Sequence, residues 1–264
     1  MRSATVERLL QLNRTFYQTV APQFDETRGG LPVGWRQLRP WIQPRADRPL
    51  RVVDVGCGNG RFAWLLEEWD IPTSYHGVDA DEQLLTMASA HARTLTQVQT
   101  AFHQADFTAP TWRGDATLPP GNFDLVVCFA ALHHVPSNAL RQQLIRDLAQ
   151  LAGSGIVILS HWQFLSSMRF VRKQIAWQTI GLTAEDVEPG DALLPWQQGV
   201  HAIRYVHQTA LAEAKDLAAA AGLHLLDHFY ADGKEGNLNL YTILGSKEAQ
   251  PTVASQSRQQ ENRP

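Results

Sequence analysis

The feature that most constrains this fold is a regular alternation of short apolar runs and amphipathic segments between residues 51 and 159. Apolar runs that end at glycine or aspartate are typical of buried parallel strands. We expect such strands at residues 51–55, 74–78, 98–103, 123–128 and 155–159. Apolar residues recur at helical spacing in the segments 61–69, 81–91 and 138–151. This alternation predicts a doubly wound, mostly parallel α/β sheet.

The regular alternation stops after the fifth strand. Residues 160–207 contain tryptophans and prolines without a clear period, which predicts an insertion at about 161–207 over the carboxyl edge of the sheet. A helix at 208–221 and strands at 223–230 and 238–244 are expected to follow. The connector between these two strands is short and rich in turn residues, so we expect an antiparallel terminal hairpin.

Length and composition favour one domain with two extensions. The chain has 264 residues, 44% of them hydrophobic, which is enough for one large core. Residues 51–245, with the insertion, form the expected domain, and residues 1–50 are expected to precede it as a helical leader that covers the ligand site. The polar, Gln-rich residues 246–264 are expected to be disordered. No signal peptide or membrane span is expected, because no long uninterrupted apolar stretch occurs. Two cysteines without a CxxC pair suit a cytoplasmic protein without disulfides.

The positive charge is almost all arginine, within a net charge of -3. Arginines alternate with Trp35 and Trp41 between Arg28 and Arg51, opposed by one acid, Asp47. Arginine beside aromatic rings suits contact with phosphates and bases. A solvated linker explains the same pattern, so an anionic partner and a linker both stay open.

A glycine loop, Gly56-Cys57-Gly58-Asn59-Gly60, lies between the first strand and the first helix. Such a loop lets a ligand approach the backbone and the helix N-terminus. Dinucleotide enzymes use G-x-G-x-x-G/A with a small sixth residue, whereas Arg61 occupies that position here. The bulky arginine disfavours a pyrophosphate at this turn.

Acidic residues end the next two strands. Asp79 follows the glycines by about twenty residues, where a carboxylate accepts ribose hydroxyls of NAD or S-adenosylmethionine alike. Asp106 could accept from an adenine amino group while Phe107 packs on the base, although Asp106 could equally cap a helix or turn. Together these strand ends predict a nucleoside site.

The sequence resembles class I S-adenosylmethionine-dependent methyltransferases in its successive motifs. These are the glycine loop, the acids at the ends of the next two strands, residues 123–128 and Ala131-Leu132-His133-His134-Val135. The resemblance covers about residues 15–159 and implies a seven-stranded sheet with the last strand antiparallel. It implies that the cofactor is S-adenosylmethionine: the glycines adjoin its methionine part, Asp79 the ribose, Asp106 and Phe107 the adenine, and Phe129 the methyl side. The full expected cofactor site is Tyr17, Arg28, Asp54, Gly56, Gly58, Gly60, Asp79, Ala80, Asp106, Phe107 and Phe129.

A narrower resemblance concerns the methyl acceptor. Three segments are similar to the eukaryotic wobble-uridine tRNA methyltransferases, which esterify a carboxymethyl group. They are the leader around Phe16-Tyr17 and residues 24–28, the Leu132-His133-His134 segment, and Arg204-Tyr205-Val206-His207. Bacterial proteins of unassigned substrate share these features. Residues 161–192 depart from the pattern. This resemblance implies tRNA as a possible acceptor and allows a small activator subunit, for which no sequence feature can be assigned.

The acceptor side is expected to use Arg204, His207 and His134. An arginine would orient an acceptor carboxylate, and Arg204 and His207 would share a face if their segment is helical. His207 or His134 could act as base toward a hydroxyl or amine, although the sequence does not tell whether His133 or His134 faces the site. No metal site is expected, because the histidines lack ligand spacing. Trp162, Trp177 and Trp196 either stack on a base or form the core of the insertion, and core is expected for at least two.

The sequence therefore predicts a methyltransferase that acts on a carboxylate, hydroxyl or amine of tRNA or a small metabolite. The alternatives are an NAD-dependent dehydrogenase and a methyltransferase-fold protein that binds without catalysis.

Overall fold

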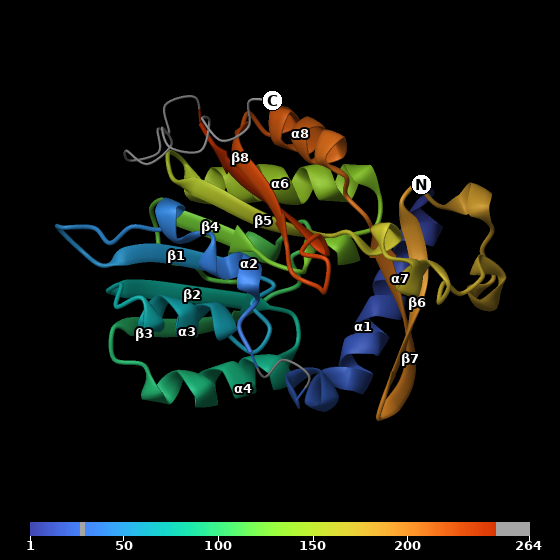
Figure 1. Cartoon of the computed structure of the whole chain (residues 1–264), viewed down its shortest axis with the longest axis horizontal. Coiled ribbons are helices and arrows are strands. Elements are labelled where there is room, and N and C mark those ends of the chain that lie inside the picture. The colour runs from blue at the N-terminus through green and yellow to red at the C-terminus, as the bar shows by residue number, and fades with distance from the viewer. Residues whose placement is uncertain (27–29, 247–264) are drawn as a thin grey trace.

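The computed structural model describes residues 1–26 and 30–246, without the side chains of residues 21–26 and 198. Within these residues a seven-stranded sheet has the order β3-β2-β1-β4-β5-β9-β8 (Figure 1). The strands are β1 Leu50–Val55, β2 Thr73–Asp79, β3 Val98–Gln104, β4 Leu125–Cys128, β5 Ile156–Trp162, β8 His224–Ala231 and β9 Asn239–Gly245. Strands β1 to β5 are parallel, and β9 is antiparallel to both β5 and β8. The predicted fold class, with its terminal hairpin, is confirmed.

Helices cover both faces of this sheet. The longer ones between strands are α3 Arg61–Glu68, α4 Glu82–His91, α6 Asn138–Ala152 and α8 Leu211–Ala220. Shorter turns of helix are α2 Val33–Arg36, η1 Arg39–Trp41, η2 Ala92–Thr94, α5 Trp112–Asp115, η3 Leu132–His134, η4 Phe164–Ser166, α7 Met168–Val171, η5 Trp177–Ile180 and η6 Ala184–Asp186.

Two hydrophobic layers follow from the alternation of side chains along each strand. Val53 belongs to a cluster with Leu144 and Leu148 of α6, whereas its neighbour Val52 belongs to a cluster with Phe62 and Leu66 of α3. Strands buried on both faces need continuous apolar runs, which is the pattern seen in the sequence.

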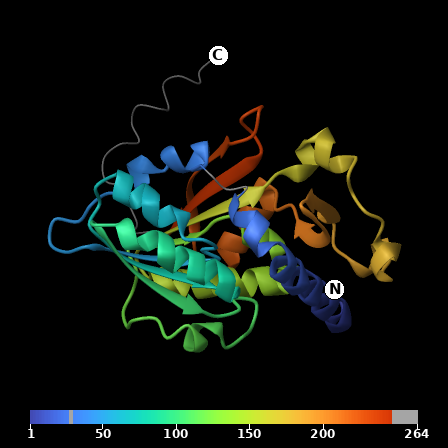
Figure 2. The same cartoon turned by 90° about the horizontal axis from the view of Figure 1, so that it is seen from below.

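The N-terminal helix and the insertion lie together at one end of the sheet (Figure 2). Helix α1 Ser3–Glu26 runs beside a ribbon formed by β6 Asp191–Gln198 and β7 Val200–His207. Leu9 packs with Leu193 and Tyr205, and Phe16 packs with Trp196. The apolar face of α1 thus forms a core with residues almost two hundred positions later in the chain.

The ribbon changes one sequence expectation. Arg204 and His207 lie on strand β7 rather than on a helix, because β7 pairs with β6 from Asp191↔His207 to Gln198↔Val200. Three residues apart on a strand, their side chains point to opposite faces. The following helix starts at Leu211 rather than residue 208, because the N–H of Gln208 donates to the carbonyl of Gly190, the residue before β6 (2.9 Å).

Buried charges join the insertion to the main sheet. The Arg141 side chain of α6 is 2% exposed and donates to Glu188 (2.8 Å) and Glu213 (3.1 Å). His207 contacts Asp191 through Nδ1 (2.7 Å) and Glu213 through Nε2 (2.9 Å). Burial lowers the pKa of His207, but the hydrogen bonds to the two carboxylates outweigh burial and raise it. This network ties together α6, α8 and the ribbon.

Two expectations cannot be compared with the structure. The expected disordered tail at 246–264 lies outside the described residues apart from Ser246, and so does Arg28. Within the described part of the chain, no helix is both long and apolar enough to cross a membrane.

Candidate active site

A cavity of about 590 Å³ opens where the parallel strands end, between the glycine loop and α1. Ligands of doubly wound sheets bind at this edge. Ten of the predicted site residues line it: Tyr17, Asp54, Gly56, Gly58, Asp79, Ala80, Asp106, Phe107, Phe129 and His134. Gly60, Arg204 and His207 are not part of its wall.

The three glycines of the loop have different surroundings, although each has positive φ. A Cβ on Gly56 would lie 2.5 Å from the Ala131 Cβ, so the loop touches the segment after β4. A Cβ on Gly58 would meet nothing within 4 Å, and this residue faces the cavity. A Cβ on Gly60 would lie 3.1 Å from the Ala88 Cβ, so this glycine packs the start of α3 against α4. Gly58 is therefore the glycine at which a side chain would occupy ligand space.

Two carboxylates lie beneath and beside this loop. Asp79 accepts the backbone N–H of Gly58 (2.9 Å) through one oxygen and that of Asp81 (3.0 Å) through the other. Burial raises the pKa of Asp79 despite these donors. Asp54 is buried and accepts the Tyr75 hydroxyl at 2.6 Å. Burial raises the pKa of Asp54 to about 7, against an ordinary value of 3.8.

Asp106 is held by α1 as well as by its own turn. One oxygen accepts the N–H of Thr108 (2.9 Å), as in the turn that the sequence left open. The other accepts Nε (3.3 Å) and Nη2 (3.1 Å) of Arg14. The Phe107 ring lies 3.5 Å from where a Gly56 Cβ would stand, next to the glycine loop.

His134 is the histidine of the pair that lines the cavity. It is 8% exposed, with Nε2 lying 2.7 Å from the Tyr17 hydroxyl and Nδ1 lying 3.1 Å from the Tyr205 carbonyl oxygen. The neighbouring His133 ring packs 5.6 Å from Trp162 instead. The Asn13 amide nitrogen is farther from Nδ1 (3.5 Å) and donates to two carbonyl oxygens at 3.2 Å. Because a carbonyl oxygen only accepts, these contacts favour the neutral tautomer of His134 with its proton on Nδ1 and its lone pair on Nε2.

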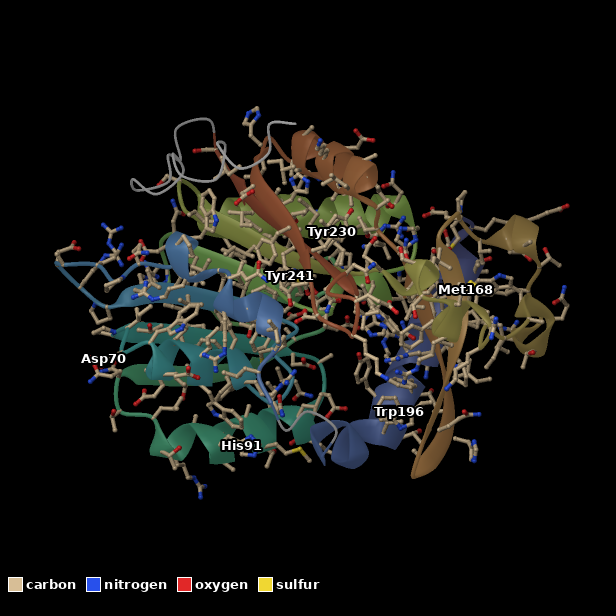
Figure 3. The ribbon with its side chains drawn as sticks, in the orientation of Figure 1. Asp70, His91, Met168, Trp196, Tyr230 and Tyr241 are labelled. Carbon is tan, nitrogen blue, oxygen red and sulfur yellow. The ribbon has the colours of Figure 1, made fainter. Side chains whose placement is uncertain are left out.

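Arg204 lies among aromatic rings rather than in the cavity wall. Its guanidinium carbon is 4.8 Å from the ring centre of Trp162, 5.4 Å from that of Phe16 and 5.8 Å from that of Trp196. In Figure 3 Trp196 lies over α1 and β7, whereas Tyr241 lies at the main sheet. Trp196, like Trp177, packs in a core cluster of the insertion.

The arginines between residues 36 and 51 contact the protein itself. Arg36 pairs with Glu68, and Arg48 donates through both Nη atoms to Asp124 (2.6 and 2.8 Å). Arg51 donates to the Pro120 carbonyl (2.8 Å). These contacts favour the linker interpretation of this segment.

Sequence reasoning missed several residues of the cavity wall: Asn13, Arg14, Trp35, Ser160, Asn239 and Tyr241. Asn239 is the first residue of β9. It donates to Asp232 (2.9 Å), which also accepts the Tyr241 hydroxyl (2.6 Å). The spacing of Asn239 and Tyr241 along β9 places both on one face, and that period-two pattern was the available signal. Nothing local marked Asn13 or Arg14.

Among the residues whose side chains the structure describes, the cavity wall carries more carboxylates than cations. Its acids are Asp54, Asp79, Asp81, Glu82 and Asp106. Its arginines are Arg14 and Arg61. Such a wall suits a ligand with positive charge better than one with a pyrophosphate.

The comparisons with known proteins agree with this geometry. The methyltransferase domain family matches residues 52–155, from within β1 to the residue before β5. The ubiquinone biosynthesis O-methyltransferase of Burkholderia thailandensis is 29% identical over 189 residues, 71% of this chain and 70% of the relative. That of Nitrosomonas europaea is 30% identical over 172 residues, 65% of this chain and 63% of the relative.

Solved structures share the fold. Magnesium protoporphyrin IX methyltransferase from Synechocystis, with bound SAH, has a TM-score of 0.53 at 19% identity and covers 89% of this chain and 85% of its own. The 1,6-didemethyltoxoflavin N1-methyltransferase of Burkholderia thailandensis has a TM-score of 0.59 at 15% identity, with coverages of 89% and 88%. The chain is a class I S-adenosylmethionine-dependent methyltransferase.

Membership in this family disfavours the dehydrogenase alternative, and the carboxylate-rich wall of the methyltransferase agrees with that conclusion. The roles of individual residues toward cofactor and acceptor stay predictions.

Proposed function

We propose that this methyltransferase transfers a methyl group to a hydroxyl oxygen of a small organic acceptor. The observation that carries the proposal is His134, a cavity residue whose Nδ1–H is directed at a carbonyl oxygen, so that Nε2 can take a proton. A hydroxyl needs such a base, because it is a weak nucleophile until its proton leaves. The curated relatives are named as O-methyltransferases, which supports the same choice.

The residues present fit S-adenosylmethionine. We infer that Gly56 and Gly58 hold its methionine part, that Asp79 accepts its ribose hydroxyls and that Phe107 packs on its adenine. Asp54 and Asp79 lie in the cavity wall, and a cationic ligand there would favour their ionised forms, which burial disfavours. When bound, S-adenosylmethionine supplies an electrophilic methyl group on a sulfonium. The chain's own residues then have to orient the acceptor, exclude water and take up its proton.

The other acceptors predicted from the sequence have weaker support. A carboxylate acceptor would need a cation beside it, and the expected one, Arg204, packs among aromatic rings outside the cavity wall. The two arginines of the wall have other partners, because Arg14 pairs with Asp106 and Arg61 donates to the Gly30 carbonyl. A tRNA acceptor would be favoured by surface arginines whose charge is not already paired, whereas Arg36 and Arg48 pair with acids of the protein and Arg51 donates to a carbonyl.

The test is methyl transfer from labelled S-adenosylmethionine to four acceptor classes: catechols, benzoates without hydroxyls, anilines and total bacterial tRNA. We expect label in methyl ethers of the catechols, with loss of transfer in His134→Asn at unchanged affinity for S-adenosylhomocysteine. Label that appears in esters, amines or tRNA but not in ethers would refute the hydroxyl acceptor. Cofactor binding without transfer to any class would favour the non-catalytic alternative.

A further inference from the structure

Both ring nitrogens of His134 already have partners inside the protein. Nδ1 lies 3.1 Å from the Tyr205 carbonyl oxygen, which can only accept. Nε2 lies 2.7 Å from the Tyr17 hydroxyl, which must therefore donate to it. An acceptor hydroxyl that enters the cavity cannot reach the lone pair of Nε2 without displacing Tyr17.

Tyr17 can connect the two groups. Its hydroxyl donates one hydrogen to Nε2, and its oxygen keeps lone pairs that accept hydrogen bonds. The side chain comes from α1, lines the cavity and is half-buried. Its ring meets the His134 ring edge-on at 5.3 Å and the Phe16 ring edge-on at 5.2 Å, which fixes the phenol in place.

We propose that Tyr17 is a catalytic residue that relays the acceptor's proton to His134, an inference that rests on the proposed hydroxyl acceptor. The acceptor O–H donates to the Tyr17 oxygen while the Tyr17 hydrogen moves to Nε2. The acceptor oxygen forms its bond to the methyl carbon, and the carbon–sulfur bond breaks with its electron pair left on sulfur. The positive charge lost at sulfur appears on the His134 imidazolium, so atoms and charge balance.

Asn13, one helical turn before Tyr17, positions this relay. Its amide oxygen accepts the N–H of Tyr205 (2.9 Å), and its amide nitrogen donates to the carbonyls of Tyr205 (3.2 Å) and His134 (3.2 Å). Asn13 is 6% exposed, so these contacts are shielded from water. The residue thereby fixes the carbonyl that keeps the proton on Nδ1. Helix α1 supplies both the relay and its support.

The experiment compares Tyr17→Phe with wild type on two acceptors, catechol and 4-nitrocatechol ionised at alkaline pH. The phenylalanine keeps the ring contacts and removes only the hydroxyl. A relay is needed for catechol, which must lose a proton, and is not needed for the nitrocatecholate. We expect kcat to fall about 10²-fold with catechol and to change little with nitrocatecholate. The same pattern is expected for His134→Asn, which provides a second variant.

Tyr230→Phe is the matched control, because Tyr230 is 45% exposed on β8 and outside the cavity wall. Calorimetry with S-adenosylhomocysteine and thermal melting establish that each variant is folded. An equal loss with both acceptors in both variants would mean that Tyr17 only shapes the cavity, and would overturn the relay. Unchanged turnover of catechol in Tyr17→Phe would overturn the relay and leave the hydroxyl acceptor intact. Absence of any methyl ether from the wild-type enzyme would refute the hydroxyl acceptor, and the relay with it.

Discussion

The two sides of the cavity are built in different ways. The side formed by the glycine loop, Asp79 and Phe107 comes from consecutive strand ends within residues 54–107. The opposite side combines α1 with His134 and the backbone of β7, and one of its hydrogen bonds joins residues 192 positions apart. The first side is encoded locally, and the second exists only when the insertion is folded against α1. Substitutions on the first side should therefore change cofactor affinity, whereas substitutions on the second side should change the stability of the fold around the acceptor.

The largest effect is expected on stability at the acceptor side. Arg141→Met removes a buried cation from Glu188 and Glu213, and breaking such a buried pair costs about 3 kcal/mol of unfolding free energy. Urea unfolding measures this loss. Arg45→Met is the control, because the Arg45 side chain is 44% exposed in its ion pair with Asp124. This change should lower the unfolding free energy by less than about 1 kcal/mol. Equal losses in the two variants would show that the network does not hold the insertion in place.

Cofactor affinity should respond to the other side. Asp79→Ala removes the acceptor for the ribose hydroxyls and for the Gly58 N–H, so affinity for S-adenosylhomocysteine should fall about 50-fold. Calorimetry measures the change, with exposed Glu235→Ala as the control. Affinity within about threefold of wild type would remove Asp79 from the cofactor site.

A pH effect on stability should come from Asp54. Its pKa is about 7 in the folded protein against an ordinary value of 3.8, so between these values the native state keeps a proton that the unfolded chain has lost. Unfolding free energy should then fall as pH rises, by roughly 2 kcal/mol between about pH 5 and pH 7.

Asp54→Asn should remove this contribution, because the amide oxygen still accepts the Tyr75 hydroxyl and nothing titrates. The measurement is the difference between wild type and Asp54→Asn in urea unfolding at several pH values, without ligand. His207 contributes equally to both proteins and cancels. Parallel stability curves would show that the Asp54 pKa is not raised.

The smallest effect is expected at Arg204. Arg204→Met loses the contacts with the rings of Phe16, Trp162 and Trp196, which should cost about 1 kcal/mol of stability. Cofactor affinity should be unchanged, and turnover of catechol should fall only slightly. Complete loss of turnover in a stable variant would restore the carboxylate-clamp hypothesis for this residue.

The difference between the two sides also explains what the sequence could predict. Gly58 and Asp79 follow apolar strands, and strand ends of a parallel sheet meet at one edge, so local pattern was enough. The sequence did not reveal that Arg204 and His207 lie on a strand. The pairing of β7 with β6 makes this segment a strand, and side-chain spacing within the segment does not report that pairing. The contacts of Asn13 with Tyr205 and of Arg14 with Asp106 join distant segments, and no local period reports them.

The order in which the chain is made gives the α1 contacts a further consequence. During synthesis α1 emerges well before the ribbon, because Tyr205, which Asn13 binds through its N–H and its carbonyl, follows 192 residues later. Leu9, Phe16 and Val20 are almost fully buried in the finished protein. Until the ribbon has been made, Leu9 and Phe16 lack the ribbon residues that cover them. Contacts this distant in sequence form slowly. The nascent enzyme therefore exposes an apolar face of α1 during most of its translation, and such transiently exposed apolar surface favours aggregation.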